Sequence, residues 1–229
     1  MVFYNWQSSI ALDWSENAII KIMIYKKILF ITTLLCSFGG VSGQSINEEY
    51  GIVRKNDKIT LSERWIPFLG THLKSRQIQG VFQTSASMDK MLRTVTDEAI
   101  IMEWQKNIIK YQFFPGSDST WQTYSLYEMP WPLNNQDYLL KYTLTKQADK
   151  SMILSFQDSL NEQLAPVNKD ADRKPTIGQW QFEKLANGNT QVIYTIVTKP
   201  TSYPRFITDS IVRNNLMTII STLIAVAEK

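Results

Sequence analysis

The sequence predicts an α+β fold in which a strongly curved antiparallel β-sheet wraps around one long C-terminal helix. Three observations support this prediction. Short strand-like segments separated by turn residues run through most of the chain, one short helical segment interrupts them early, and the last segment changes to a helical pattern. A long helix with an apolar stripe is buried most economically in the hollow of such a sheet.

The predicted strands alternate in hydrophobicity and are bounded by turn residues. The clearest hairpin signal is Asn187-Gly188, which joins the last two strands. The stretch Leu160–Thr176 contains Pro166 and Pro175 and is expected to be a loop. The expected strands are Tyr50–Arg54, Lys58–Ile66, Arg76–Thr84, Ile108–Phe114, Thr120–Glu128, Tyr138–Leu144, Met152–Phe156, Ile177–Leu185 and Thr190–Thr198.

Two helices are predicted. The short one is Met88–Thr96, with Ser87 as its N-cap and Asp89 in its first turn, where a carboxylate favours the helix dipole. The long one lies within Tyr203–Glu228, a stretch with no glycine and no proline after Pro204, and would extend about 30–35 Å. Its apolar stripe consists of Val212, Leu216, Ile219, Ile220, Leu223, Val226 and Ala227.

Charge and composition exclude several function classes. The formal net charge is +3 and no long basic run is present, so nucleic acid is not expected as a partner. The chain has one cysteine, Cys36, and one histidine, His72, which leaves too few ligands for a typical zinc site and no pair for a disulfide. His72 is interpreted as a solvated loop residue. We therefore expect no metal and no cofactor.

Residues 23–43 resemble a signal peptide. Lys26 and Lys27 form a basic region, Ile28–Leu35 an apolar region, and Val41-Ser42-Gly43 a small-residue cleavage site before Gln44. The apolar stretch is shorter than the ~20 residues that span a bilayer. Residues 1–22 are interpreted as a non-native upstream extension and residues 44–229 as the mature domain, located in the periplasm or secreted.

Cys36 raises the alternative of a lipoprotein anchor. Bacterial lipoprotein signals place a small residue just before the modified cysteine, whereas Leu34 and Leu35 precede it here. Lipid attachment at Cys36 is therefore not favoured. Cleavage before Gln44 would leave a mature chain without cysteine, which suits an exported protein that does not depend on disulfides.

A collinear set of motifs resembles the START (StAR-related lipid-transfer) family of the helix-grip superfamily. The most specific is Glu128–Tyr138, with sequence EMPWPLNNQDY, which is similar to the Pro-Trp-Pro run followed by Arg-Asp in that family. Further matches, in the family's order, are Phe82–Leu92, Glu103-Trp104, Gly178-Gln179-Trp180 and Tyr203–Ile207. The resemblance covers about Tyr50–Lys229. It implies a hydrophobic tunnel between the sheet and the C-terminal helix.

The chain departs from the family motif at Gln136, where relatives usually have arginine before the aspartate. Arginine there would pair with Asp137 or another acid, whereas Gln136 can only form hydrogen bonds. We expect a different cavity mouth if that ion pair shapes it in relatives.

The candidate cavity residues are mostly aromatic residues on the expected strands. Each has an alternative role as ordinary core, but buried tyrosine and tryptophan bring polar groups that need partners. Ligand-wall residues on the last helix would be core first and cavity wall second. The candidates are Trp104, Trp121, Tyr142, Phe156, Trp180, Tyr194, Leu216 and Ile220.

Other residues are interpreted structurally. Trp131, between two prolines, is expected to lock its loop by packing. Arg64 and Asp137 either meet a polar headgroup or form a surface salt bridge. The adjacent carboxylates Asp97 and Glu98 are interpreted as solvated surface.

These patterns predict a non-catalytic protein that binds or carries a lipid or other hydrophobic small molecule. It would act as a monomer, with transient membrane contact as an accompanying expectation. Two alternatives stay open. One is a polyketide cyclase or aromatase-like enzyme, because related helix-grip proteins include such enzymes. The other is an interaction module whose cavity has collapsed, which cavity volume would distinguish.

Overall fold

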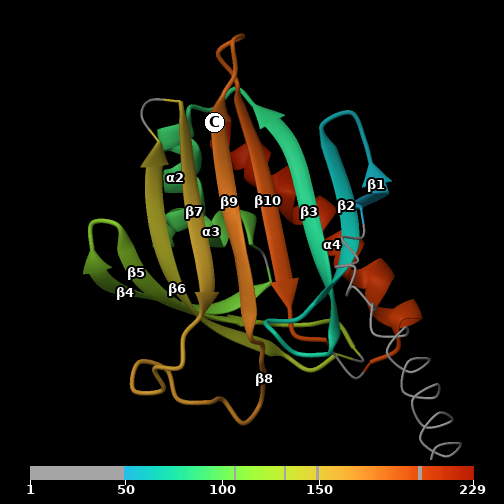
Figure 1. The fold of residues 1–229 in the computed structure, drawn as a ribbon. Coiled ribbons are helices and arrows are strands. Elements are labelled where there is room, and N and C mark those ends of the chain that lie inside the picture. The colour runs from blue at the N-terminus through green and yellow to red at the C-terminus, as the bar shows by residue number, and fades with distance from the viewer. Residues whose placement is uncertain (1–48, 106, 132, 148–149, 201–202) are drawn as a thin grey trace, which may run out of the picture. The chain divides into compact units, whose positions relative to one another are not determined.

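The computed structural model describes residues 49–105, 107–131, 133–147, 150–200 and 203–229. The predicted upstream extension, signal peptide, Cys36 and cleavage site before Gln44 lie outside these residues, so they stay predictions. The described chain forms one sheet with helices on one of its faces, in agreement with the predicted α+β class (Figure 1).

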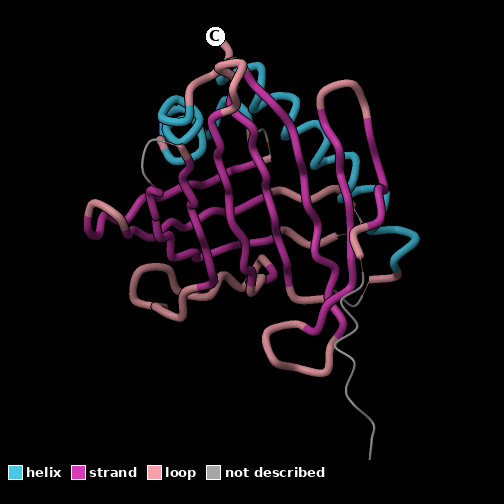
Figure 2. The backbone as a smooth tube through the Cα atoms, turned by 45° about the horizontal axis from the view of Figure 1, so that its top comes forward, coloured by secondary structure: helices cyan, strands magenta, loops and turns pink. Residues whose placement is uncertain are grey.

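The sheet has ten strands in the order β1-β2-β3-β10-β9-β7-β6-β5-β4, with the short β8 pairing with β6. All neighbours are antiparallel except β8 and β6, which are parallel. The sheet bends so strongly that β4 and β5 run across the direction of β9 and β10 (Figure 2). The strands are β1 (Gly51–Lys55), β2 (Ile59–Pro67), β3 (Lys74–Thr84), β4 (Ile108–Ser117), β5 (Thr120–Tyr127), β6 (Gln136–Gln147), β7 (Ser151–Asp158), β8 (Asp172–Arg173), β9 (Thr176–Lys184) and β10 (Thr190–Thr198).

Three described helices cover the concave face: α2 (Met88–Thr96), α3 (Glu98–Trp104) and α4 (Arg205–Ala227). Helix α2 has the predicted bounds, and Ser87 Oγ accepts a hydrogen bond from the Lys90 amide as its N-cap. Helix α3 was not predicted. Asp97 caps it by accepting from the Ala99 amide at 3.0 Å, so the interpretation of Asp97 as solvated surface misses its structural role.

Helix α4 is seated unevenly in the hollow of the sheet. Near its C-terminal end, Ile220, Leu223, Ile224 and Ala227 are at most 3% exposed and belong to the main core. Nearer its N-terminal end, Leu216 is only half-buried although it faces the sheet. The C-terminal half therefore packs solidly, and the N-terminal half covers space that side chains do not fill.

An ion-pair network fixes the N-terminal half of α4 to β2 and β3. Arg213 binds Glu63 through two contacts, at 3.0 and 2.7 Å, and the hydrogen-bonded Glu63 carboxylate raises the pKa of Arg213. Asp209 accepts from Arg76 at 2.7 Å and from Arg213 at 3.3 Å. Glu63 is only 7% exposed, so these contacts are shielded from water more than surface pairs are. They hold this half of the helix in place where apolar packing is sparser than in the C-terminal half.

The C-terminal end of α4 is anchored by a carboxylate. Glu228 Oε1 accepts from Thr84 Oγ1 at 3.0 Å and from the Ser85 amide at 3.2 Å, next to the end of β3. The hydrogen bond from the Ser85 backbone is the main reason why the pKa of Glu228 lies below its ordinary value. Folding and ionisation of Glu228 are therefore coupled.

We predict that Glu228→Gln lowers the free energy of unfolding at neutral pH. Because the folded-state pKa is depressed, ionised Glu228 stabilises the fold above the unfolded-state pKa, and this contribution disappears as pH falls through the folded-state pKa. Denaturant unfolding from pH 7 to pH 3 should show the variant converging with the wild type. Glu162→Gln, at an exposed loop position, is the control; a pH-independent difference for Glu228→Gln would contradict the prediction.

Candidate functional site

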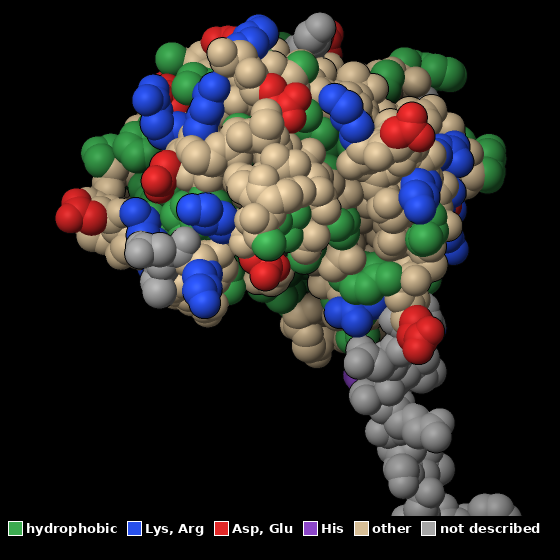
Figure 3. Space-filling view, turned by 90° about the horizontal axis from the view of Figure 1, so that it is seen from above, with side chains coloured by type: hydrophobic (Ala, Val, Ile, Leu, Met, Phe, Trp, Pro, Cys, Tyr) green, Lys and Arg blue, Asp and Glu red, His purple; other side chains and the backbone are tan. Residues whose placement is uncertain are grey.

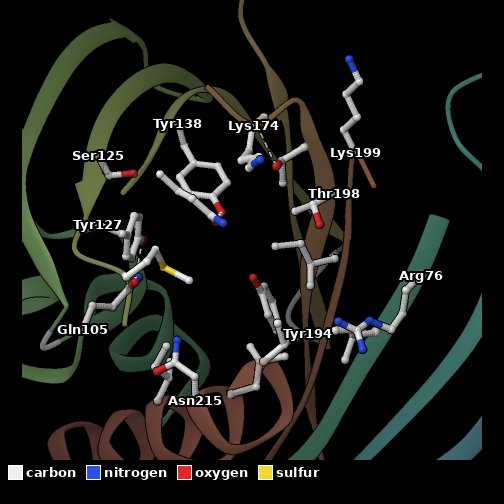
Figure 4. A pocket seen from close by; sticks show the side chains of 18 of the residues that line it. Arg76, Gln105, Ser125, Tyr127, Tyr138, Lys174, Tyr194, Thr198, Lys199 and Asn215 are labelled. Carbon is white, nitrogen blue, oxygen red and sulfur yellow. Dashed lines mark hydrogen bonds between the residues drawn. The ribbon is translucent and has the colours of Figure 1, made fainter. Parts of the chain in front are cut away.

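A partly enclosed cavity of about 440 Å³ lies between the sheet and the N-terminal half of α4 (Figure 4). Strands β3, β5, β6, β7, β9 and β10 supply most of one wall, with Trp65 of β2 and Tyr111 of β4, and α3 and α4 supply most of the other, with Val95 of α2. Its size falls within the ~300–1,000 Å³ of typical small-molecule sites. The cavity is a direct result of the uneven seating of α4.

All but one of the sequence-predicted candidates line this cavity. Trp104 closes it from the end of α3, and its Nε1 donates to the Thr94 carbonyl at 2.8 Å, so the indole is held in place. Whether these residues contact a ligand stays a prediction. Those that line the cavity are Trp104, Tyr142, Phe156, Trp180, Tyr194, Leu216 and Ile220.

Trp121 does not line the cavity, which corrects the prediction for this residue. It lies on the same face of β5 as Thr123 and Ser125, which do line it, but at the start of the strand. There its ring stacks on Tyr142 with 5.6 Å between centroids and 6° between planes. Trp121 therefore supports the cavity wall from outside.

The aromatic wall follows from strand register. Tyr142 pairs with Phe156 across β6 and β7, and Tyr194 pairs with Trp180 across β10 and β9. The ring centroids are 5.6 Å apart in the first pair, 4.1 Å in the second, and 6.3 Å between Phe156 and Tyr194. Gly178 lies opposite Phe156, where an added Cβ would meet the Phe156 ring, so glycine makes room for this contact. The result is a continuous aromatic surface.

The polar groups inside the cavity are uncharged. Tyr127 donates to Gln105 Oε1 at 2.6 Å, and Tyr138 donates to Gln136 Oε1 at 2.8 Å. Burial raises the pKa of Tyr142 to about 12 and raises the pKa of Tyr194 further still. The surroundings of these hydroxyls therefore disfavour a negative charge.

Charged lining residues gather at one end of the cavity, where β3 begins, β10 ends and α4 begins. Asp209 is paired there with Arg76, and Lys174 Nζ lies 3.3 Å from Asp172 Oδ2. The Arg205 guanidinium lies 4.2 Å from the centroid of Trp65. In Figure 4, Lys199 extends away from the cavity. The site thus has a neutral aromatic interior and a charged, largely self-paired end.

Sequence reasoning missed several polar lining residues. Tyr127 shares the β5 face of Trp121, and Tyr138 shares the β6 face of Tyr142, so alternation along the strands could have found both. Asn215 lies four residues from Ile211 and from Ile219, which also line the cavity, so helical periodicity points to it. Gln105 follows the unpredicted helix α3 and carried no signal.

Gln136 and Asp137 point to opposite faces of β6. Gln136 lines the cavity, whereas Asp137 is completely buried outside it. Arg173 Nε and Nη2 donate to the two Asp137 carboxylate oxygens at 2.9 and 2.8 Å. Arg173 also donates to the Ala165 carbonyl at 3.3 Å, which ties the long loop before β9 to β6. Asp137 is therefore neither a headgroup ligand nor a surface salt bridge, contrary to both sequence-based alternatives.

Three further interpretations can be compared with the structure. Trp131 is 91% exposed, so the expectation that it packs to lock its loop is wrong. Arg64 lies outside the cavity lining; its Nε donates to Gln77 Oε1 at 2.5 Å, and its guanidinium lies 4.5 Å from the Tyr50 ring centroid. His72 is exposed in the turn between β2 and β3. Among the described residues, no cluster of His, Cys, Asp or Glu could hold a metal ion.

The chain was compared with known proteins by sequence and by structure. No protein-family model matches the chain. An uncharacterized protein of Pseudomonas aeruginosa is 25% identical over 206 residues, which cover 88% of this chain and 98% of that protein.

The solved structures show the fold. Human StAR-related lipid transfer protein 5 superposes with a TM-score of 0.68 at 12% identity, covering 90% of this chain and 97% of that one. A STAR-related lipid transfer protein of Xanthomonas axonopodis gives 0.67 at 19% identity, covering 79% and 99%. A Streptomyces aromatase/cyclase gives 0.51 at 12% identity, covering 67% and 94%. The chain therefore has the START, or helix-grip, fold.

We predict that Arg173→Met lowers the free energy of unfolding by about 3–5 kcal/mol, because it leaves the fully buried Asp137 carboxylate without its partner. The double variant Asp137→Leu/Arg173→Met should be less destabilised than the sum of the single changes. Urea unfolding measures both. Lys174→Met, whose partner Asp172 is 40% exposed, is the control and should change stability by about 1 kcal/mol or less. A similarly small effect of Arg173→Met would refute the prediction.

Proposed function

We propose that the protein binds a lipid or other hydrophobic small molecule in the cavity beneath α4 and carries it without chemical change. The observation that carries this proposal is the cavity with a neutral aromatic interior that the N-terminal half of α4 covers but does not fill. Apolar ligand surface leaves water with a gain of roughly 25 cal/mol per Å², so binding requires no charged residue. The START fold of the chain supports the same ligand class.

The proposal also places the protein outside the cytoplasm, as a periplasmic or secreted carrier. Support comes from the signal-peptide pattern of residues 23–43 and from the lack of cysteine after Cys36. The proposed carrier is a monomer. Transient membrane contact would let the ligand exchange, and the exposed side chains of Trp131 and Phe206 are compatible with such contact. On the face shown in Figure 3, basic and acidic side chains are interspersed rather than gathered into a basic patch.

An enzymatic function has one observation in its favour, the similarity to the Streptomyces aromatase/cyclase, but that TM-score is lower than those of the lipid-transfer proteins. Among the described lining residues, Asp209 is the only carboxylate, and it is paired with Arg76, Arg205 and Arg213. Apart from the lysines at the charged end, a general acid or base would have to be a tyrosine such as Tyr142, whose pKa burial raises. The geometry therefore favours binding. The cavity volume also disfavours an interaction module with a collapsed interior.

Filling the cavity should weaken ligand binding. Ile196 lines the cavity from β10, so we predict that Ile196→Trp weakens binding of a fluorescent lipid probe at least about tenfold and reduces co-purified lipid in native mass spectrometry. Ile193, an odd number of positions away on the same strand, lies on the opposite face; Ile193→Trp is the matched control and should bind normally. Wild-type protein that never binds lipid, sterol or fatty-acid probes would overturn the proposal.

Localisation has its own test. We predict that a chain expressed in a Gram-negative host from Met23 is found in the periplasmic fraction with Gln44 as its first residue, as read by intact mass. Ile31→Arg, which interrupts the apolar region, should keep the chain uncleaved in the cytoplasm. A wild-type chain that stays cytoplasmic at full length would refute export without affecting the ligand-binding proposal.

A further inference from the structure

We propose that the cavity selects an uncharged ligand with a flat ring system, whose single polar group binds the Tyr194 hydroxyl and the Asn215 carboxamide. This inference rests on the proposed function, because it specifies the chemical class of ligand that the same cavity takes. It is carried by the shape of the aromatic wall, by the hydrogen-bonding groups that the protein leaves unused, and by the distribution of charge.

The shape of the wall favours rings over flexible chains. Phe156, Tyr194 and Trp180 lie nearly parallel to their neighbours, with 25° between Phe156 and Tyr194 and 28° between Tyr194 and Trp180. Trp104 meets Trp180 edge-on at 88° and closes the end of this surface. A planar ligand can stack along such a surface, which adds to the gain from burial alone. An acyl chain gains the burial but not the stacking.

The hydrogen-bonding groups of the cavity divide into used and unused ones. The Tyr127 hydroxyl donates to Gln105 and the Tyr138 hydroxyl donates to Gln136, so neither hydroxyl proton is available to a ligand. Neither Tyr194 nor Asn215 has a side-chain hydrogen bond among the described residues. In Figure 4 the Tyr194 hydroxyl, from β10, points into the cavity, and Asn215 faces the same space from α4.

A polar residue within an apolar helical stripe needs a partner or water. Asn215 has Ile211 and Ile219 one turn before and after it, and Leu216 beside it, all lining the cavity. An amide and a hydroxyl together can donate to a carbonyl oxygen or accept from a hydroxyl. One carbonyl or hydroxyl on the ligand would therefore satisfy both Tyr194 and Asn215.

The electrostatics exclude a charge on the ligand at this depth. Figure 4 shows Arg76 on the Tyr194 side of the cavity, but its guanidinium is already paired with Asp209 at 2.7 Å and with Glu63 at 3.5 Å. Burial also raises the pKa of Tyr194, which shows that its surroundings penalise negative charge. A carboxylate or phosphate at this position would lose hydration without gaining an unpaired cation, because Arg76 is already bound by two carboxylates, and this loss is costly. The polar group of the ligand is therefore neutral.

Matched probes test this inference. The probes are 1-acetylpyrene, which has a carbonyl, 1-ethylpyrene, which has the same shape without it, pyrene-1-carboxylate, which is charged, and methyl parinarate, a neutral linear chain. We expect wild-type protein to bind 1-acetylpyrene about 3- to 10-fold more tightly than 1-ethylpyrene, as one hydrogen bond provides, and to bind the carboxylate most weakly of the pyrenes.

Tyr194→Phe and Asn215→Leu should each reduce the preference for 1-acetylpyrene, and the double variant should bind 1-acetylpyrene and 1-ethylpyrene with nearly equal affinity. The affinity for 1-ethylpyrene itself should stay at the wild-type value. Tyr124→Phe, on the opposite face of β5, is the control and should keep the wild-type ratio. Thermal melting of each variant verifies that it is folded. A ratio that survives both changes, or a carboxylate that binds as tightly as the ketone, overturns the inference.

The two proposals fail in different ways. Binding of methyl parinarate with no binding of any pyrene would overturn the ring-ligand inference and leave the carrier function standing. Failure of all four probes and of lipid and sterol probes would overturn the carrier function itself. Tight binding of 1-acetylpyrene that depends on Tyr194 supports both.

Discussion

The structure depends on the way helix α4 is held at its two ends by different interactions. Its C-terminal half is buried among sheet side chains around Ile220 and Leu223, and Glu228 anchors its end. Its N-terminal half is held by the ion pairs of Asp209 and Arg213 with β2 and β3. Ion pairs fix a position without filling volume, whereas apolar packing fixes position by filling it. A cavity can therefore exist under one half of a helix whose other half completes the core.

The sheet supplies the opposite wall of the cavity and keeps it from collapsing. Its bend brings aromatic rings from β6, β7, β9 and β10 into one continuous surface, and glycine at two positions makes the close approaches possible. Gly178 admits the ring of Phe156, and an added Cβ at Gly80 would lie 2.7 Å from Ile220 Cδ1, so Gly80 admits the helix. Rings are rigid and large, so a wall built from them does not collapse into the empty space as flexible aliphatic chains would.

Successive side chains of strand β6 point to opposite faces of the sheet, which separates the polar groups inside the cavity from those outside it. Gln136 faces the cavity and accepts from Tyr138, while its neighbour Asp137 is buried on the other side with Arg173. An arginine at position 136 would bring a cation into the cavity; glutamine keeps the interior neutral. The departure from the usual START motif therefore agrees with the proposal of a neutral ligand, and the ion pair between Asp137 and Arg173 lies outside the cavity.

The sequence by itself determined the class of fold, most strands, helix α2 and the long final helix, because these follow from local periodicity and capping. It also indicated most of the aromatic wall. It did not reveal α3, since seven residues are too few to show a helical period. Only the tertiary structure decided that Trp121 supports the wall from outside, that Asp137 pairs with Arg173 from a distant loop, that Trp131 is exposed, and that a cavity lies beneath the N-terminal half of α4. These features depend on the curvature of the sheet and on how far along its length α4 packs against the sheet. Both are set by contacts between residues far apart in the sequence, which a local sequence pattern does not record.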